Sequence, residues 1–212
     1  MDDPSGELGM SFVLRYRRKE GQGRNKAGAS DTNDAYQNQL KTIGSFSNLA
    51  DFWELYAFLK RPGEFDHLGD LTLFKDDIPP MWEDERNKHG GRLVFRTPKI
   101  AAAAYWERLA FAMLGRQFEE WDAINGVCAN TRHNQSELEA VLVIWTATSE
   151  SEVIDSITRD MNRLFELPPR RRIAFKSHRK YYGKSRPAAS SGAPTPSADA
   201  SDAVAPLADS HQ

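Results

Sequence analysis

Three segments with apolar residues at helical spacing constrain the fold of this 212-residue chain more than any other feature. They span residues 49–59, 106–113 and 149–165. Ser47 and Asn48 are favourable residues to start the first helix, and Gly115 is a favourable residue to end the second. Ser149 and Glu152 have the spacing of a capping box, so we expect the third helix to begin there. The sequence therefore predicts three amphipathic helices.

Short runs rich in β-branched and aromatic residues lie between these helices and predict strands. They cover residues 12–18, 71–75, 92–97, 126–132, 139–147 and 172–177. Because strands and helices alternate irregularly, the pattern favours an antiparallel sheet with helices on one face, an α+β fold. We expect one folded domain over residues 10–184. Residues 1–9 and 185–212 contain too few apolar residues to form a core, so we expect them to be disordered tails.

The composition limits the classes of function. A formal net charge of −2 argues against a protein that coats nucleic acid through bulk charge. Cys128 is the single cysteine and lies in an apolar run, which indicates a buried thiol. The absence of a signal-like start and of a long apolar run predicts a cytoplasmic protein, with the nucleus as an alternative. The histidines and acids match no metal-binding or catalytic motif, so we expect no metal, cofactor or catalytic residue.

A basic segment lies near the end of the expected domain. Residues 167–184 contain seven lysines or arginines and no acid. Such a segment favours an anionic ligand. The alternative interpretation is a solvated edge strand, whose charges prevent aggregation and need no ligand.

The loop expected between two prolines and two glycines, residues 79–91, contains the most informative pair of side chains. Trp82 lies there beside Glu83, outside any apolar run. A tryptophan in this position either anchors its own loop or offers an aromatic platform to a ligand. A platform beside a carboxylate suits a flat, cationic base that donates hydrogen bonds.

These residues belong to a set of motifs that resembles the signature of the translation initiation factor 4E cap-binding family. The motifs lie at residues 52–56, 73–84, 87–91, 106–115, 126–128, 144–146, 167–169 and 177–178, within a span of about residues 12–184. Residues 61–63 and 112–118, together with Tyr36, are more similar to the divergent class of the 4E homologous protein. The resemblance implies a curved antiparallel sheet of about eight strands, with three helices on its convex face and a cap slot on its concave face.

The resemblance also implies a role for each residue of the slot. The 7-methylguanine of a messenger RNA cap would stack between Tyr36 and Trp82, and Glu83 would accept hydrogen bonds from its N1 and N2 donors. Met81 and Trp145 would complete the base site, although Trp145 alone, in an apolar strand, is more typical of core packing. Methylation makes the guanine cationic, so aromatic faces and a carboxylate favour it over ordinary guanine. Because tyrosine has a smaller face than the tryptophan of the main class, we expect weaker cap binding.

Three cations match the positions that hold the cap triphosphate in the family: Arg92, Arg132 and Lys184. Val141 lies where the family usually has a further lysine. We therefore expect Arg132 to make more of the contacts with the phosphates, or His133 or a neighbour to substitute for the lysine.

The resemblance places a second surface on the helices. Leu49, Trp53, Arg108 and Phe111 would receive a helical peptide with a Tyr-x-x-x-x-Leu-hydrophobic motif, from the initiation scaffold factor or from translation repressors. Without the resemblance, Trp53 would equally fit the core face of an amphipathic helix. Arg108 replaces an acid of the main class and would repel a basic peptide residue, which favours a regulator over a general initiation factor.

Four functions are therefore compared. They are a regulator that binds capped messenger RNA, an initiation factor that recruits the ribosome, an interaction module with little cap affinity, and a cap-hydrolysing enzyme. The enzyme lacks an acidic metal-binding cluster in the sequence. Retention of Trp82, Glu83, Arg132 and Trp145 together argues against the module. We expect a monomeric, non-enzymatic cap-binding protein.

Overall fold

The computed structural model describes residues 6–19, 38–64, 69–76, 78–134, 137–168 and 172–179. Their strands form one antiparallel sheet in the order β2-β1-β3-β5-β6-β4-β7. The strands are β1 (Glu7–Arg18), β2 (Lys41–Asn48), β3 (Gly69–Lys75), β4 (Gly91–Pro98), β5 (Ile124–Asn134), β6 (Glu137–Thr146) and β7 (Ala174–Ser177). The helices are α2 (Leu49–Tyr56), α3 (Ala102–Leu114) and α4 (Ser151–Leu164), with short 3-10 turns η1 (Lys99–Ala101) and η2 (Trp121–Ala123). The α+β prediction is confirmed, with seven described strands where about eight were expected.

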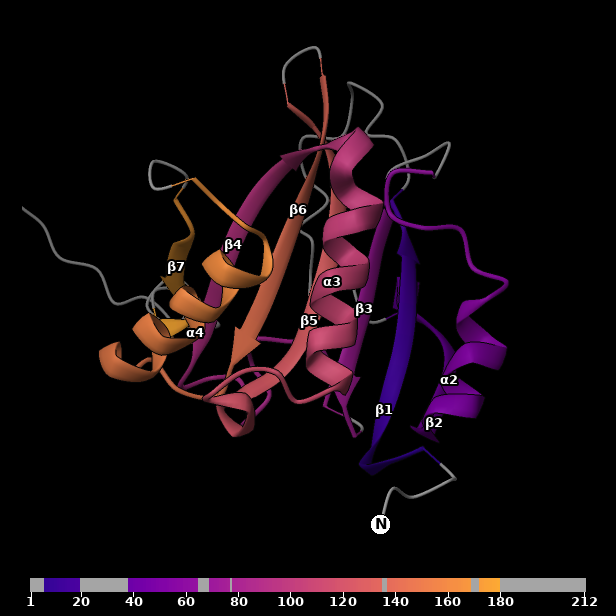
Figure 1. Ribbon diagram of the computed structural model, residues 1–212, viewed down its shortest axis with the longest axis horizontal. Coiled ribbons are helices and arrows are strands. Elements are labelled where there is room, and N and C mark those ends of the chain that lie inside the picture. The colour runs from indigo at the N-terminus through magenta and orange to yellow at the C-terminus, as the bar shows by residue number, and fades with distance from the viewer. Residues whose placement is uncertain are drawn as a thin grey trace, which may run out of the picture.

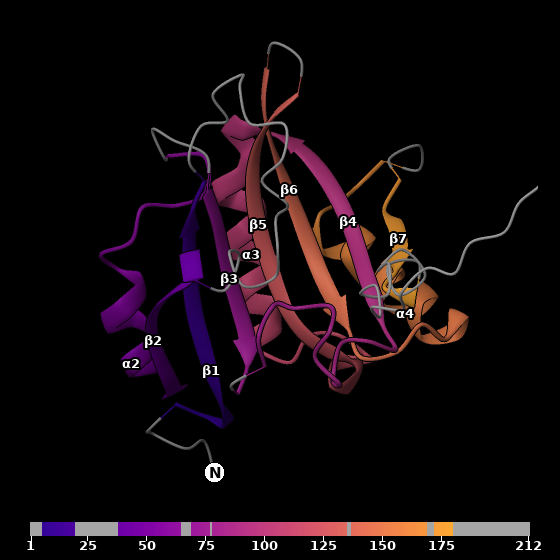
Figure 2. The same cartoon turned by 180° about the vertical axis from the view of Figure 1, so that it is seen from behind.

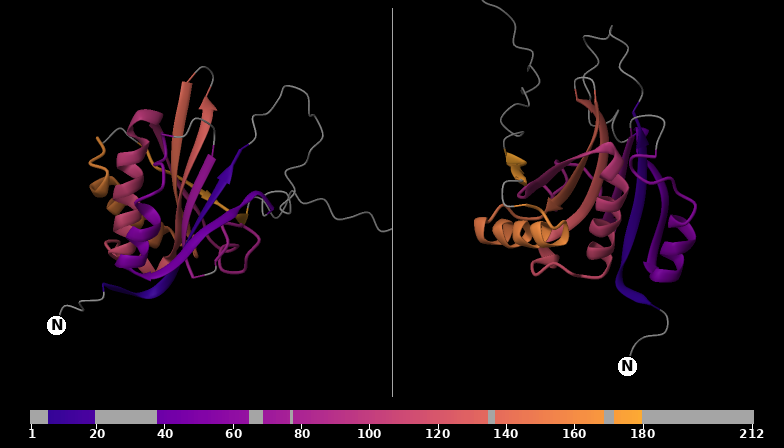
Figure 3. Two further views of the ribbon diagram at one scale, coloured as in Figure 1. Left: turned by 90° about the vertical axis from the view of Figure 1, so that its right-hand side faces the viewer. Right: turned by 45° about the horizontal axis from the view of Figure 1, so that its top comes forward.

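The three helices lie on one side of the sheet (Figure 1), which we call the helical face. Seen from behind, no described helix covers the other side (Figure 2), which we call the open face. An edge-on view shows the two sides clearly separated by the curved sheet (Figure 3). Among the described residues, no helix is long and apolar enough to cross a membrane.

Each central strand supplies side chains to both faces, because neighbouring residues in a strand point in opposite directions. Leu73 packs in the main core beneath the helices, together with the fully buried Trp106 of α3. Its neighbour Phe74 belongs to a second apolar cluster on the open face, which includes Cys128 and Trp145. Cys128 is buried, as the sequence predicted. The period of the strands therefore separates the packing core from the floor of a possible site.

Two strand predictions need correction. β1 begins at Glu7, so residues 7–9 are not part of an N-terminal tail as expected. Leu8 is buried and packs in the main core, which explains the longer strand. β2 was missed because its sequence is largely polar and, within it, only Phe46 is buried. The expected tail at 185–212 lies outside the described residues and stays a prediction.

The two predicted helix starts have different outcomes. Asn48 caps α2 as expected, because its side-chain oxygen accepts a hydrogen bond of 2.8 Å from the Asp51 amide. The capping box predicted at Ser149 is wrong. α4 begins at Ser151, and its N-cap residue Glu150 makes no capping side-chain bond. The Thr148 hydroxyl instead accepts from the Glu150 amide at 3.2 Å, which fixes the turn before the helix.

Candidate functional site

A row of residues that lie directly opposite one another on neighbouring strands forms the floor of the site. Phe74 in β3 lies opposite Gly126 in β5, and Gly126 lies opposite Trp145 in β6. Arg92 in β4 lies opposite Trp145 on its other side. Residues paired in this way point to the same face of an antiparallel sheet. The row therefore lies on the open face.

Gly126 provides the space that the aromatic floor needs. A Cβ atom at this position would lie only 2.3 Å from the Phe74 ring. With no side chain there, Phe74 meets Trp145 edge to face, with ring centroids 5.8 Å apart. On the other side, the Arg92 guanidinium lies 5.4 Å from the Trp145 ring. Trp145 is therefore held between an aromatic ring and a cation.

A loop before β4 folds over this floor and is held by two buried amides. The Asn87 amide nitrogen donates to the carbonyl of Pro79 at 2.9 Å and to that of Met81 at 2.8 Å. The Asn125 amide nitrogen donates to Asn87 Oδ1 at 2.9 Å and to the Arg86 carbonyl at 2.6 Å. These bonds satisfy three buried backbone carbonyls of the loop and hold its backbone in place without any ligand. The tryptophan and the glutamate on the loop are thus positioned in advance.

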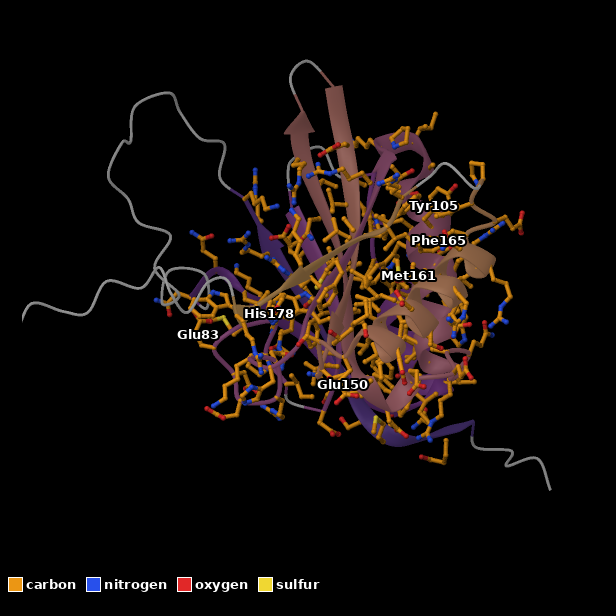
Figure 4. The ribbon with its side chains drawn as sticks, turned by 90° about the vertical axis from the view of Figure 1, so that its left-hand side faces the viewer. Glu83, Tyr105, Glu150, Met161, Phe165 and His178 are labelled. Atoms are coloured by element: carbon orange, nitrogen blue, oxygen red, sulfur yellow. The ribbon has the colours of Figure 1, made fainter. Side chains whose placement is uncertain are left out.

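His178 connects the loop to the floor, a role that sequence reasoning missed. Its Nδ1 lies 2.8 Å from the carbonyl oxygen of Asn87, and its ring centroid lies 4.7 Å from that of Trp145. The side chain is fully buried, and this burial lowers the pKa of His178, so the ring is neutral at pH 7. Figure 4 shows His178 on the same side as Glu83, away from Met161 of α4. Its sequence signal was the motif at residues 177–178, to which the resemblance assigned no role.

A cavity of about 290 Å³ lies between the loop and the floor, and we call it the slot. It brings together most of the side chains that the sequence assigned to cap binding: Met81, Trp82, Glu83, Arg92, Arg132 and Trp145. The two others, Tyr36 and Lys184, lie outside the described residues. Their predicted roles stay predictions.

Glu83 and its neighbour Asp84 differ in their electrostatic state. Burial raises the pKa of Glu83 above its ordinary value of 4.5. Hydrogen bonds from Arg86 lower the pKa of Asp84, whose carboxylate lies 2.9 Å from the Arg86 guanidinium. Of these two acids, only Glu83 lines the slot. A cationic ligand that donates hydrogen bonds would stabilise its charged form.

Three further charged residues of the slot were not identified from the sequence. Arg17, near the end of β1, and Lys19, just after this strand, both contact the buried carboxylate of Asp70, each at 2.6 Å. All three line the slot, so its wall has two cations around one acid. Val141 is only 1% exposed and packs in the second apolar cluster, so it offers nothing to a phosphate. The basic alternation along β1 was the signal that could have found Arg17 and Lys19.

The helical face carries the second predicted site. Leu49 is 42% exposed and Trp53, one turn later on α2, is 48% exposed. The Trp53 ring lies 5.6 Å from that of Phe111 in α3. Arg108, which was expected beside them, instead contacts the end of α4 through the Leu164 carbonyl at 3.2 Å. The structure thus joins the three apolar residues, while Arg108 is engaged with another helix.

Comparisons with known proteins agree with this geometry. A family model described as eukaryotic initiation factor 4E matches residues 7–191. The eukaryotic translation initiation factor NCBP of Oryza sativa subsp. japonica is 30% identical over 168 residues, which is 79% of this chain and 69% of the relative. Human eukaryotic translation initiation factor 4E is 31% identical over 155 residues, 70% of each chain. The solved complex of Caenorhabditis elegans eIF4E-3 with the 4E-binding protein Mextli and a cap analogue has a TM-score of 0.69, with 27% identity over 85% of this chain and 96% of that one.

Proposed function

This chain belongs to the eukaryotic initiation factor 4E family, and we propose that it binds the 7-methylguanosine cap of messenger RNA as a participant in, or a regulator of, translation initiation. The observation that carries the proposal is the slot itself. It combines two tryptophans, the carboxylates of Glu83 and Asp70 and several cations in a single cavity. An aromatic and acidic site beside positive charges suits a ligand with a cationic base and an anionic tail.

The base is recognised by shape and by charge. It stacks on Trp82, with Tyr36 as the second ring, and Trp145 and Met81 pack against it. Stacking on an aromatic side chain is worth about 1–3 kcal/mol per base. Glu83 accepts the hydrogen bonds of the base, each worth about 1.5–3 kcal/mol with a charged partner. Because ordinary guanine carries no positive charge, it loses part of both interactions.

The triphosphate lies against the basic side of the slot. Arg92, Arg132 and Lys184 hold it, as the family resemblance implies. Arg17 and Lys19 add two cations to the same wall, and Asp70 offsets one of them. These two residues are better placed than the buried Val141 to replace the lysine that the family usually has. The bound cap is held and not hydrolysed.

The helical face serves a protein partner. Leu49, Trp53 and Phe111 receive a helical peptide with a Tyr-x-x-x-x-Leu-hydrophobic motif. Leu49 and Trp53 are exposed and Phe111 is partly buried beside Trp53, and their apolar surface suits an amphipathic helix. The likeness to the 4E homologous protein class favours a regulator, acting as a monomer in the cytoplasm through a domain that begins with β1 at Glu7 and ends near residue 184. An interaction module without cap affinity is not favoured, since such a module needs no charged slot.

Tryptophan fluorescence tests the proposal by titration with 7-methylguanosine triphosphate and with guanosine triphosphate. Saturable quenching by the methylated ligand is expected, and the affinity should fall about 30- to 150-fold in Glu83→Ala, from the loss of about 2–3 kcal/mol. Glu85→Ala is the matched control, because the Glu85 side chain is 79% exposed and contacts Lys88 outside the slot. Equal quenching by both nucleotides, or an unaffected Glu83→Ala variant, would refute cap recognition by this slot.

A further inference from the structure

The basic residues of β7 are not used by the slot. Arg172 and Lys176 flank Ala174, the first residue of this edge strand. Ile173 and Phe175 pack against the main core, whereas Arg172, Ala174 and Lys176 are exposed. Since side chains alternate along an extended chain, Lys176 of β7 and Arg172, two residues before the strand, point to the open face.

The register of the sheet places these charges next to the slot. Lys176 lies directly opposite Arg92, and Ala174 lies opposite Val94. Arg92 lines the slot and lies opposite Trp145 on the next strand. Side chains opposite one another in antiparallel strands have Cβ atoms about 5 Å apart. A cation of the slot and a cation of β7 are therefore direct neighbours.

A second cavity, of about 320 Å³, lies at this edge of the sheet. It is lined by Val94, Arg96, Arg172, Ala174 and Lys176, and we call it the edge groove. Its lining holds three cations and no acid. Arg96 forms an ion pair with Glu139, but neither Arg172 nor Lys176 forms one with any residue that the structure describes. Two positive charges are thus left to attract an anion.

We infer that the edge groove binds the phosphate backbone of the messenger RNA chain directly beyond the cap. The inference rests on the proposed function, because the cap triphosphate is what brings an RNA chain to Arg92. A strand rises about 3.3 Å per residue, so Arg92 and Arg96 lie about 13 Å apart along β4, a reach that suits the first nucleotides. Val94 and Ala174 offer an apolar floor to a ribose or a base, while the flanking cations contact phosphates.

The placement of the charges distinguishes this role from simple protection of a sheet edge. Charges that only discourage edge pairing need no particular face and no cavity. Here Arg172 and Lys176 line one cavity with Arg96 of the neighbouring strand. That cavity continues the row that begins at Trp145 in the slot. The arrangement matches an anionic chain that leaves the slot across β4 and β7.

The test compares two ligands on the full chain, the cap nucleotide 7-methylguanosine triphosphate and a capped single-stranded RNA of about ten nucleotides. The variant Arg172→Ala/Lys176→Ala removes the two groove cations. The control variant Arg159→Ala/Arg163→Ala removes equal charge from α4, where both side chains are mostly exposed. Each phosphate contact on single-stranded RNA contributes about 0.7 to the slope of log affinity against log salt. For capped RNA, the slope of the groove variant should therefore be shallower by about 1.4. Between 50 and 200 mM salt, its affinity should then fall by a factor about seven times smaller than that of the unaltered chain.

The outcomes separate the two proposals. The inference expects several-fold weaker binding of capped RNA by the groove variant, unchanged binding of the cap nucleotide, and no effect in the control variant. Unchanged binding of capped RNA would overturn it and leave the basic segment as a solvated edge strand. Equal losses for both ligands would also overturn it, because the cations would then act on the triphosphate. If the unaltered chain failed to bind the cap nucleotide at all, the proposed function would be wrong, and the inference with it.

Discussion

The open face and the helical face differ in how far the tryptophan of each predicted binding site is exposed to solvent. On the open face, Trp145 is 6% exposed and Asn87 has no exposed surface. On the helical face, Trp53 is 48% exposed and Leu49 is 42% exposed. On the open face, the Trp145 ring is buried among polar groups and cations. On the helical face, Trp53 and Leu49 expose apolar surface to the solvent.

This difference indicates how each face recognises its ligand. A slot whose loop is already held by buried hydrogen bonds loses little conformational entropy on binding, and its selectivity comes from charge. Its affinity should therefore depend on pH and on salt. An exposed apolar surface gains affinity mainly from the area it buries, which makes it insensitive to both. The predictions below test this contrast.

The largest effect is expected at Trp53. Trp53→Ala removes a large aromatic anchor and should weaken binding of a Tyr-x-x-x-x-Leu-hydrophobic peptide by about 2–4 kcal/mol. Calorimetric titration with the peptide measures this loss, and the affinity for the cap nucleotide should stay the same. Ile100→Ala is the control, since Ile100 is 96% exposed on η1. A parallel loss of cap binding in Trp53→Ala would break the separation of the two faces.

A slightly smaller effect is expected from Asn87→Ala. The substitution leaves the carbonyls of Pro79 and Met81 without their buried donor, which should cost about 2–3 kcal/mol of stability. Thermal denaturation should show a midpoint about 5–10 °C lower, with weaker cap binding at temperatures where the variant is folded. Asn162→Ala removes a comparable bond to the Thr158 carbonyl on α4 and should leave cap affinity unchanged. If Asn87→Ala and Asn162→Ala weakened cap binding equally, the bonds of Asn87 would not be what positions the loop in advance.

The pH dependence of ligand affinity should also differ between the two faces, although by a smaller amount. Burial raises the pKa of Glu83, so in the free slot this carboxyl takes up a proton above its ordinary value of 4.5. A cationic base favours the charged carboxylate, so cap affinity should fall as the pH is lowered through that raised pKa, by at most about tenfold per pH unit. A cap dinucleotide is the suitable ligand, because it lacks the terminal phosphate that titrates near pH 6.

The control for this titration is Glu83→Gln, which should flatten the fall over the same range. The peptide affinity of the helical face should not change there. A fall that persists undiminished in Glu83→Gln would assign the pH dependence to another group of the slot, such as the buried His178.

The smallest effect concerns the second ring of the sandwich. Tyr36→Trp enlarges the stacking face and should strengthen cap binding by about 0.5–1 kcal/mol, without any change in peptide binding. Fluorescence titration with the cap nucleotide measures the gain. An unchanged affinity would indicate that Tyr36 does not stack on the base.

The sequence predicted those parts of the molecule that depend on local pattern. The helices followed from their apolar period, and Trp82 and Glu83 followed from a motif within one loop. β2 was missed because Phe46 is its one buried residue among mostly polar neighbours. Local pattern was also misleading at Ser149. In the turn after β6, the Thr148 hydroxyl accepts a hydrogen bond from the Glu150 amide, and the predicted capping box does not form.

The parts that were missed depend on contacts between distant segments. Arg17 joins Asp70 across 53 residues, and His178 reaches Asn87 across 91 residues. Strand register decides these contacts, and register depends on how the whole sheet pairs. Asp70 lies just before the predicted strand 71–75, and no local pattern in the sequence showed that Arg17 and Asp70 meet at the wall of the slot.

The central claim is that a charged slot on the open face selects a methylated, cationic base. Its most direct test is nuclear magnetic resonance of the indole N–H signals, because the chain has five tryptophans distributed between the slot, the core and the helical face. Titration with 7-methylguanosine triphosphate should shift the signals of Trp82 and Trp145 and leave that of Trp53 in place, and guanosine triphosphate should shift none of them at the same concentration. Shifts confined to Trp53, or equal shifts with both nucleotides, would contradict the account.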